Sequence, residues 1–183
     1  MTALPWGSPL THDDLRRMPD DGHRYELVDG TLLVTPAPGT AHQLVVMRLG
    51  VILDAACPGE LMVLPGPYDY VISTTTVLQP DLLVAREQDL GDANLARTPL
   101  LVVEVRSPST WRNDLGTKRL AYEGAGVPNY WIVDPDEPSI VVLGLEGGVY
   151  LEVARAAGEE PVEVDVPFPV TIVPARLVDR LRR

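Results

Sequence analysis

An acidic residue inside an apolar run is the most informative chemical feature of this sequence. Glu104 lies within residues 99–105, where leucines and valines predict a strand that is buried on both faces. An ionised carboxylate in such a place is costly unless a metal ion or a cationic side chain balances its charge. Because side chains alternate along a strand, we expect Arg106 on the same face as Glu104.

A second acidic residue stands at the start of another predicted strand. Asp81 follows Pro80 and precedes the apolar residues 82–85. If the two strands are neighbours, Asp81, Glu104 and Arg106 converge on one point. Two carboxylates that hold Mg²⁺, with a cation that holds a phosphate, form the arrangement that phosphodiester hydrolysis requires.

Structural roles compete with these assignments. Asp81 could be a turn residue after Pro80, and Glu104 could form a buried ion pair with Arg106 or Lys118. Such pairs stabilise a fold only weakly after desolvation, so we favour metal ligation for both carboxylates.

The composition predicts one domain that spans residues 1–183. The chain is 45% hydrophobic, enough for one well-buried core but short for two domains. Its single cysteine, Cys57, excludes an intrachain disulfide. We find no signal-peptide pattern and no apolar run long enough for a membrane span, and therefore expect a cytoplasmic protein with no membrane partner.

The net charge of −11 opposes nonspecific attraction to nucleic acid. A bound metal ion would cancel part of this charge. Cations also gather in one segment that contains a single acidic residue, Asp114; they are Arg106, Arg112, Lys118 and Arg119. The net charge argues against a protein that binds nonspecifically along DNA, but it is compatible with a local basic site.

The spacing of apolar residues and turn signals predicts a mixed sheet with helices on both faces. Asp29 and Gly30 predict a tight hairpin between strands 24–28 and 31–34, and Thr11 with Asp14 predicts a capped short helix. Helices are predicted at 40–56, 112–123 and 174–182, strands at 61–64, 68–77, 81–85, 100–105, 129–133, 140–143 and 149–153, a loop at 87–97, and an edge or extended arm at 162–173.

Several short motifs carry a family resemblance. They are Tyr25-Glu26-Leu27-Val28-Asp29-Gly30, His42-Gln43, Pro80-Asp81, Glu104-Val105-Arg106-Ser107-Pro108-Ser109-Thr110, Lys118 with Tyr122, and Gly126-Val127-Pro128-Asn129-Tyr130-Trp131-Ile132-Val133-Asp134-Pro135. In this combination the sequence resembles the Uma-type restriction endonuclease family of the PD-(D/E)XK nuclease superfamily. The resemblance spans most of the chain.

The resemblance implies an α/β, restriction endonuclease-like fold: a mixed β-sheet flanked by helices, with additional β-hairpins. It also implies Mg²⁺ or Mn²⁺ as cofactor and DNA as substrate. Asp81 and Glu104 match the acidic residues of the superfamily's first and second motifs, and Arg106 stands where the superfamily has lysine. Arginine stays protonated, so Arg106 can hold a phosphate or the attacking water but cannot act as a base. Lys118 is our candidate for a relocated lysine.

Three further metal ligands are predicted: Glu26, by similarity to an early acidic residue of the superfamily, the Val105 carbonyl, and His42. Other readings stay open. Glu26 could face solvent on the hairpin, His42 could be a polar residue at the edge of the core, and Lys118 could pair with Asp114 one helical turn away.

We therefore expect a Mg²⁺-dependent endonuclease acting on DNA as a homodimer, since two copies can cut both strands of a duplex. The alternative is a catalytically degenerate nuclease-fold protein that binds nucleic acid or a protein partner, as Arg106 and the acidic charge suggest. A glycosidase ranks low because aromatic residues, which line sugar clefts, make up 5% of the chain.

Overall fold

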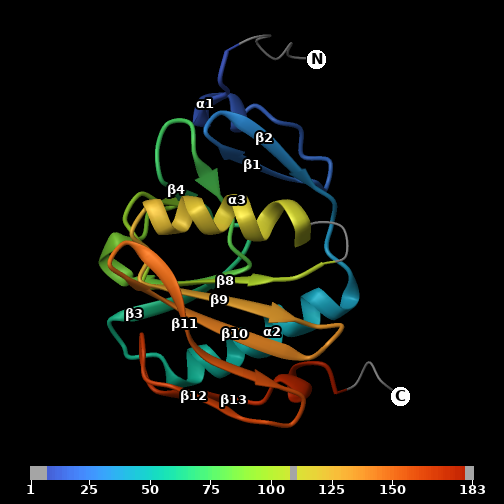
Figure 1. Cartoon of the computed structure of the whole chain (residues 1–183). Helices are drawn as coiled ribbons and strands as arrows, with labels where there is room; N and C mark the ends of the chain where they lie inside the picture. Colours follow the sequence, from blue (N-terminus) through green and yellow to red (C-terminus); the bar gives the residue numbers. More distant parts are fainter. Residues whose placement is uncertain (1–7, 108–110, 180–183) are drawn as a thin grey trace.

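The computed structural model describes residues 8–107 and 111–179, except for the side chains of residues 111–115. Its centre is a six-stranded mixed sheet with the order β11-β10-β9-β8-β6-β3 (Figure 1). These strands are β3 (Leu61–Pro65), β6 (Leu82–Arg86), β8 (Leu101–Val105), β9 (Asn129–Asp134), β10 (Ser139–Glu146) and β11 (Val149–Ala157).

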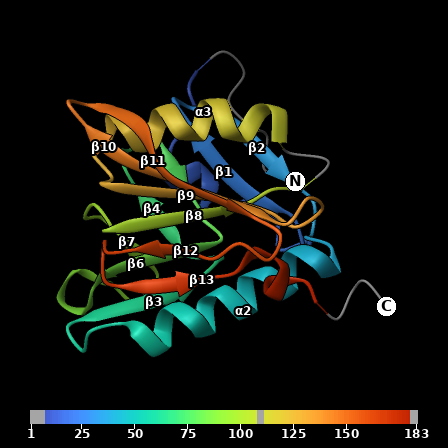
Figure 2. The same ribbon diagram turned by 60° about the horizontal axis from the view of Figure 1, so that its bottom comes forward.

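A second, five-stranded sheet has the order β2-β1-β5-β4-β7. Its strands are β1 (Arg24–Val28), β2 (Thr31–Thr35), β4 (Asp69–Val71), β5 (Val77–Leu78) and β7 (Asn94–Leu95). Helix α3 (Trp111–Gly124) lies between the two sheets, and α2 (Thr40–Ala56) covers the opposite face of the central sheet (Figures 1 and 2). The short helices are α1 (His12–Leu15), η1 (Glu87–Asp89) and η2 (Pro174–Leu177).

The predicted hairpin joins β1 to β2. Val28 pairs with Thr31, so the turn consists of two residues, Asp29 at φ 49° and Gly30 at φ 77°. Both lie in the left-handed region that this turn type requires. A Cβ on Gly30 would also come within 2.3 Å of Pro9 Cβ, so no other residue fits there without movement.

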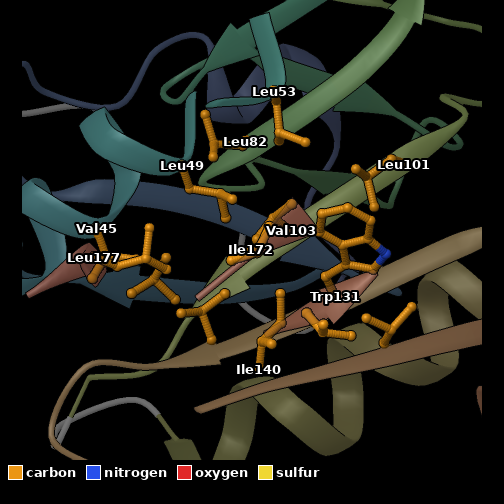
Figure 3. Close-up of a cluster of buried hydrophobic side chains, with 14 of the residues drawn as sticks. Val45, Leu49, Leu53, Leu82, Leu101, Val103, Trp131, Ile140, Ile172 and Leu177 are labelled. Carbon is orange, nitrogen blue, oxygen red and sulfur yellow. The ribbon is translucent and has the colours of Figure 1, made fainter. Parts of the chain in front are cut away.

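Successive side chains along the central strands point to opposite faces of the sheet, so each face has its own hydrophobic core. On β8, Leu101 and Val103 pack toward α2, whereas Val102 packs toward α3. The α2-side core includes Val45, Leu49, Leu53, Leu82, Leu101, Val103, Trp131, Ile140, Ile172 and Leu177 (Figure 3). Glu104 is two residues from Val102 on the same strand and therefore also points to the α3 side.

The structure corrects the prediction of one strand over residues 68–77. The chain instead forms β4 and β5 around a turn, in which the N–H groups of Ile72 and Ser73 donate to the Thr76 carbonyl. The Ser73 hydroxyl oxygen accepts from the Thr75 N–H at 3.2 Å. Such local bonds from Ser and Thr compete with the sheet ladder, and the apolar spacing does not reveal them.

The C-terminal third also differs from the prediction. Residues 162–173, expected as an edge or arm, form a separate hairpin of β12 (Val162–Val164) and β13 (Val170–Ile172) beside α2 (Figure 2). The final helix is the short η2, and the predicted residues 180–182 lie outside the described residues, as do 108–110. The predicted loop 87–97 contains η1 and β7.

Within the described ranges, no helix is long and apolar enough to cross a membrane.

Leu49→Ala tests the packing between α2 and the central sheet. Leu49 is fully buried, so its truncation leaves a cavity, and we expect the free energy of unfolding to fall by about 2–5 kcal/mol. Met47 lies on the same helix but is 58% exposed, and Met47→Ala should change the value by less than about 0.5 kcal/mol. Urea denaturation measures both; equal effects would contradict the assigned helix face.

Candidate active site

A buried lysine joins three elements on the α3 side of the central sheet. Lys118, on α3, has a side chain that is 2% exposed. Its Nζ lies 2.9 Å from Glu26 Oε1 on β1 and 3.2 Å from Glu104 Oε1 on β8. The side chain of Asp114, the alternative partner for Lys118, lies outside the described residues.

Asp81 lies beside the backbone of Glu104. Its N–H donates to the Val103 carbonyl at 3.0 Å, and its Oδ2 accepts from the Val105 N–H at 2.7 Å. Asp81 thus bonds to the residues on both sides of Glu104. The pairing of β6 with β8 therefore brings the two predicted carboxylates into one neighbourhood.

Two basic side chains from other elements hold the Asp81 carboxylate. Arg24 Nη2, at the start of β1, lies 2.8 Å from Oδ1, and His42 Nε2, in the first turn of α2, lies 3.0 Å from Oδ2. Sequence reasoning missed Arg24. A signal was available, because Arg24 precedes Glu26 by two residues on a predicted strand and so shares its face.

Glu26 is fully buried, so the reading in which it faces solvent is wrong. Its Oε1 accepts from the Gln79 N–H at 2.7 Å in addition to pairing with Lys118. In the described part of the chain, Glu26 Oε2 and His42 Nδ1 are buried without a hydrogen-bond partner.

Tyr122 completes the surroundings of Glu104 from one helical turn beyond Lys118. Its hydroxyl donates to Glu104 Oε1 at 2.7 Å. Burial, together with the charges of Glu104 and Glu26, raises the pKa of Tyr122 well above its usual value, which keeps this donor protonated.

Arg106 lies just beyond the end of β8. Its N–H donates to the Val133 carbonyl, and its guanidinium forms an ion pair with Asp134 at the end of β9. The side chain is 35% exposed. Arg106 is thus bonded to the end of β9. The role of Arg106 in holding a phosphate stays a prediction.

The two carboxylates differ in proton affinity. Burial pushes the pKa of Asp81 upward, but the hydrogen bond from His42 and the charge of Arg24 outweigh it and hold the pKa at about 2. Burial raises the pKa of Glu104 to about 8 despite the attraction of Lys118, and Asp81 and Glu26 add to the rise. Extra positive charge near Glu104 would therefore favour its ionised form.

The donor set suits a hard divalent cation. Carboxylate oxygens are the ligands that Mg²⁺ prefers, and Glu26 Oε2 is a buried oxygen without a described partner. Among the side chains that the structure describes, no group of three or more His, Cys, Asp or Glu is arranged to hold a metal ion. Mg²⁺ needs no such group, because it commonly binds one or two carboxylates and completes its shell with water and substrate phosphate.

Comparison with known proteins supports the nuclease character of the fold. The model of the family described as "Uma2: Putative restriction endonuclease" matches residues 12–176. A solved structure, a "putative nuclease belonging to DUF820" from Anabaena variabilis, superposes with a TM-score of 0.68 at 18% identity, covering 87% of this chain and 90% of that one. No curated protein matches the chain significantly. The predicted restriction endonuclease-like fold is confirmed.

The Glu104 environment predicts an unusual pH dependence of stability in the metal-free protein. Its pKa rises from 4.5 to about 8 on folding, so the folded state binds more protons between these values and the free energy of unfolding falls as pH increases. Glu104→Gln removes this decline. Urea denaturation in EDTA at about pH 5 and about pH 8 measures the free energy of unfolding of both proteins. If it changes equally with pH in the wild type and in Glu104→Gln, the raised pKa is not that of Glu104.

Proposed function

The chain belongs to the Uma2 family, and we propose that it is an endonuclease that hydrolyses phosphodiester bonds of DNA with the help of Mg²⁺ or Mn²⁺. One observation carries this proposal. The buried Lys118 lies between two buried carboxylates, Glu26 and Glu104. Asp81 lies beside them and accepts a hydrogen bond from the N–H of the residue after Glu104. Carboxylates that can hold a metal ion, with a cationic group beside them, are the groups that metal-assisted phosphodiester hydrolysis uses.

Asp81 and Glu104 would hold the cation, and water and the substrate phosphate would complete its shell. When bound, the cation supplies a water of lowered pKa and positive charge beside the phosphate oxygens. His42 and Arg24 fix the Asp81 carboxylate by hydrogen bonds, so its oxygens need little reorganisation. The Val105 carbonyl stays proposed as an additional ligand. The predicted ligands Glu26 and His42 are not arranged with Asp81 and Glu104 as one metal-binding group in the described residues.

The two cationic residues near Glu104 have different proposed tasks. The Lys118 ammonium, held by Glu26 and Glu104, orients the attacking water. Arg106, which directly follows β8 and is partly exposed, holds the phosphate that is cleaved. Neither task requires the residue to give up its proton.

A specific observation favours the second candidate, a noncatalytic protein that binds nucleic acid or a protein partner. Arg24 and Lys118 already balance much of the charge of Glu26, Asp81 and Glu104, so the cluster could serve the fold alone. Binding of a divalent cation separates the two candidates, because a purely structural network would not need one.

We also propose a cytoplasmic homodimer. Sedimentation analysis of the purified chain measures the subunit number directly.

Cleavage of supercoiled plasmid tests the proposed chemistry. With Mg²⁺ or Mn²⁺ we expect nicking by the wild-type protein, and a loss of at least about 100-fold in rate for Asp81→Asn and Glu104→Gln, since each removes an anionic ligand. Lys118→Met should lose a similar amount. EDTA should abolish the activity of every preparation.

Glu152→Gln is the matched control for Glu104→Gln, because Glu152 pairs with Arg155 on an exposed part of β11. It should nick plasmid at the wild-type rate. Circular dichroism confirms that each variant is folded. Equal nicking by folded wild-type and folded active-site variants would show that a contaminant cleaves the plasmid and would remove the proposed catalytic assignment.

A further inference from the structure

The candidate active site is closed to a large substrate. The side chains of Asp81, Glu104 and Lys118 are 2%, 9% and 2% exposed. A scissile phosphate must therefore approach along a defined path, and the structure offers a cavity next to the site.

A pocket of about 430 Å³ lies between the α1–β1 segment, the loop that follows β2, and α2. Arg24 and Gln79 belong to both the pocket wall and the buried network. Arg24 donates to Asp81 at 2.8 Å and to the Gln79 carbonyl at 3.0 Å, while 17% of its side chain stays exposed. Arg24 thus stands at the boundary between the pocket and the carboxylates.

The pocket wall combines groups that recognise a nucleotide. Tyr25 and His23 both line the wall, with ring centroids 6.3 Å apart and ring planes tilted by 52°, so a base can stack on the Tyr25 ring alone. Arg16 and Arg24 supply positive charge for a phosphate, and Gln43 supplies an amide that can both donate and accept hydrogen bonds. Asp20 and Asp69 also line the wall, so the phosphate must lie on the side of Arg16 and Arg24.

We propose that this pocket receives one nucleotide of an unpaired DNA strand, with its base against Tyr25 and its phosphate beside Arg16 and Arg24. This inference rests on the proposed function and specifies its substrate class. The bound strand then leads the neighbouring phosphodiester toward Asp81 and Glu104, because Arg24 contacts both regions.

Two observations favour an unpaired strand over an intact duplex. The pocket volume of about 430 Å³ is near the lower end of the range for small-ligand sites, which suits a single base that has left its stack. The net charge of −11 also disfavours duplex binding through many phosphates, whereas stacking on aromatic side chains depends less on net charge.

Fluorescence anisotropy tests the proposal without cleavage. The probes are a short labelled oligothymidylate and a labelled blunt duplex, each mixed with the full chain in Ca²⁺ and again in EDTA. We expect the oligothymidylate to bind at least about ten-fold more tightly than the duplex at the same salt concentration. Tyr25→Leu should weaken oligothymidylate binding by about five-fold or more, because the stacking surface is lost.

Two adjacent arginines provide a matched pair of variants. Arg16 lines the pocket, whereas Arg17 pairs with Asp14 and is 64% exposed. Both changes to glutamine remove one positive charge, but only Arg16→Gln should weaken binding, by about five-fold, while Arg17→Gln stays within about two-fold of wild type. Thermal denaturation confirms that the variants fold.

Three results would overturn the proposal: duplex binding as tight as oligothymidylate binding, equal effects of Arg16→Gln and Arg17→Gln, or unchanged binding by folded Tyr25→Leu. Its failure is distinguishable from failure of the proposed function. If the protein nicks plasmid with metal but shows none of these binding effects, the proposed endonuclease function stands and the proposed nucleotide pocket is wrong. If the predicted binding occurs without cleavage, the pocket stands and the proposed endonuclease function is wrong.

Discussion

Burial of Glu26, Asp81 and Glu104 in one place is the constraint on which the rest of the structure depends. Carboxylates from β1, from the residue before β6 and from β8 cannot share a dry region unless cations balance them or one of them takes up a proton. Lys118 joins Glu26 to Glu104, and Arg24 joins β1 to Asp81. The five-stranded sheet, α3 and the central sheet must therefore dock in one arrangement, because a shift of any of them would leave a buried charge unpaired.

The same constraint links stability to function. In the proposed endonuclease, a bound metal ion would replace part of the positive charge that side chains now supply to this network. The raised pKa of Glu104 and the lowered pKa of Asp81 show that the site already distinguishes two carboxylates of similar intrinsic acidity. Removing either would disturb both the fold and any bound cation, so folding controls belong to every functional test.

Local patterns predicted most of the elements. Asp29 and Gly30 marked the hairpin, and the apolar spacing of residues 40–56 marked α2 at both ends. The sequence of β8 also predicted that Glu104 and Val103 point to opposite faces of the sheet, because successive side chains of a strand alternate between its faces. The predicted strand over residues 68–77 was wrong because Ser and Thr hydrogen bonds form a turn there without disturbing the apolar pattern.

The partners within the site could be predicted only in part. Adjacency of Asp81 and Glu104 followed from neighbouring strands, and the ion pair of Glu104 with Lys118 was one of the stated alternatives. The contacts of Arg24 with Asp81 and of Lys118 with Glu26 join residues far apart in sequence and depend on how the sheets dock. Sequence periodicity places a side chain on a face and does not say which element covers that face. The pocket beside Arg24 is likewise formed by loops whose positions no local pattern specifies.

The central claim is that Asp81 and Glu104 together hold one divalent cation. Isothermal titration of Mn²⁺ into the purified chain, compared with the Asp81→Asn, Glu104→Gln double variant, tests it most directly. We predict one saturable site in the wild-type protein and its loss in the folded double variant. Absence of binding to the wild-type protein, or equal binding to both proteins, would contradict the claim.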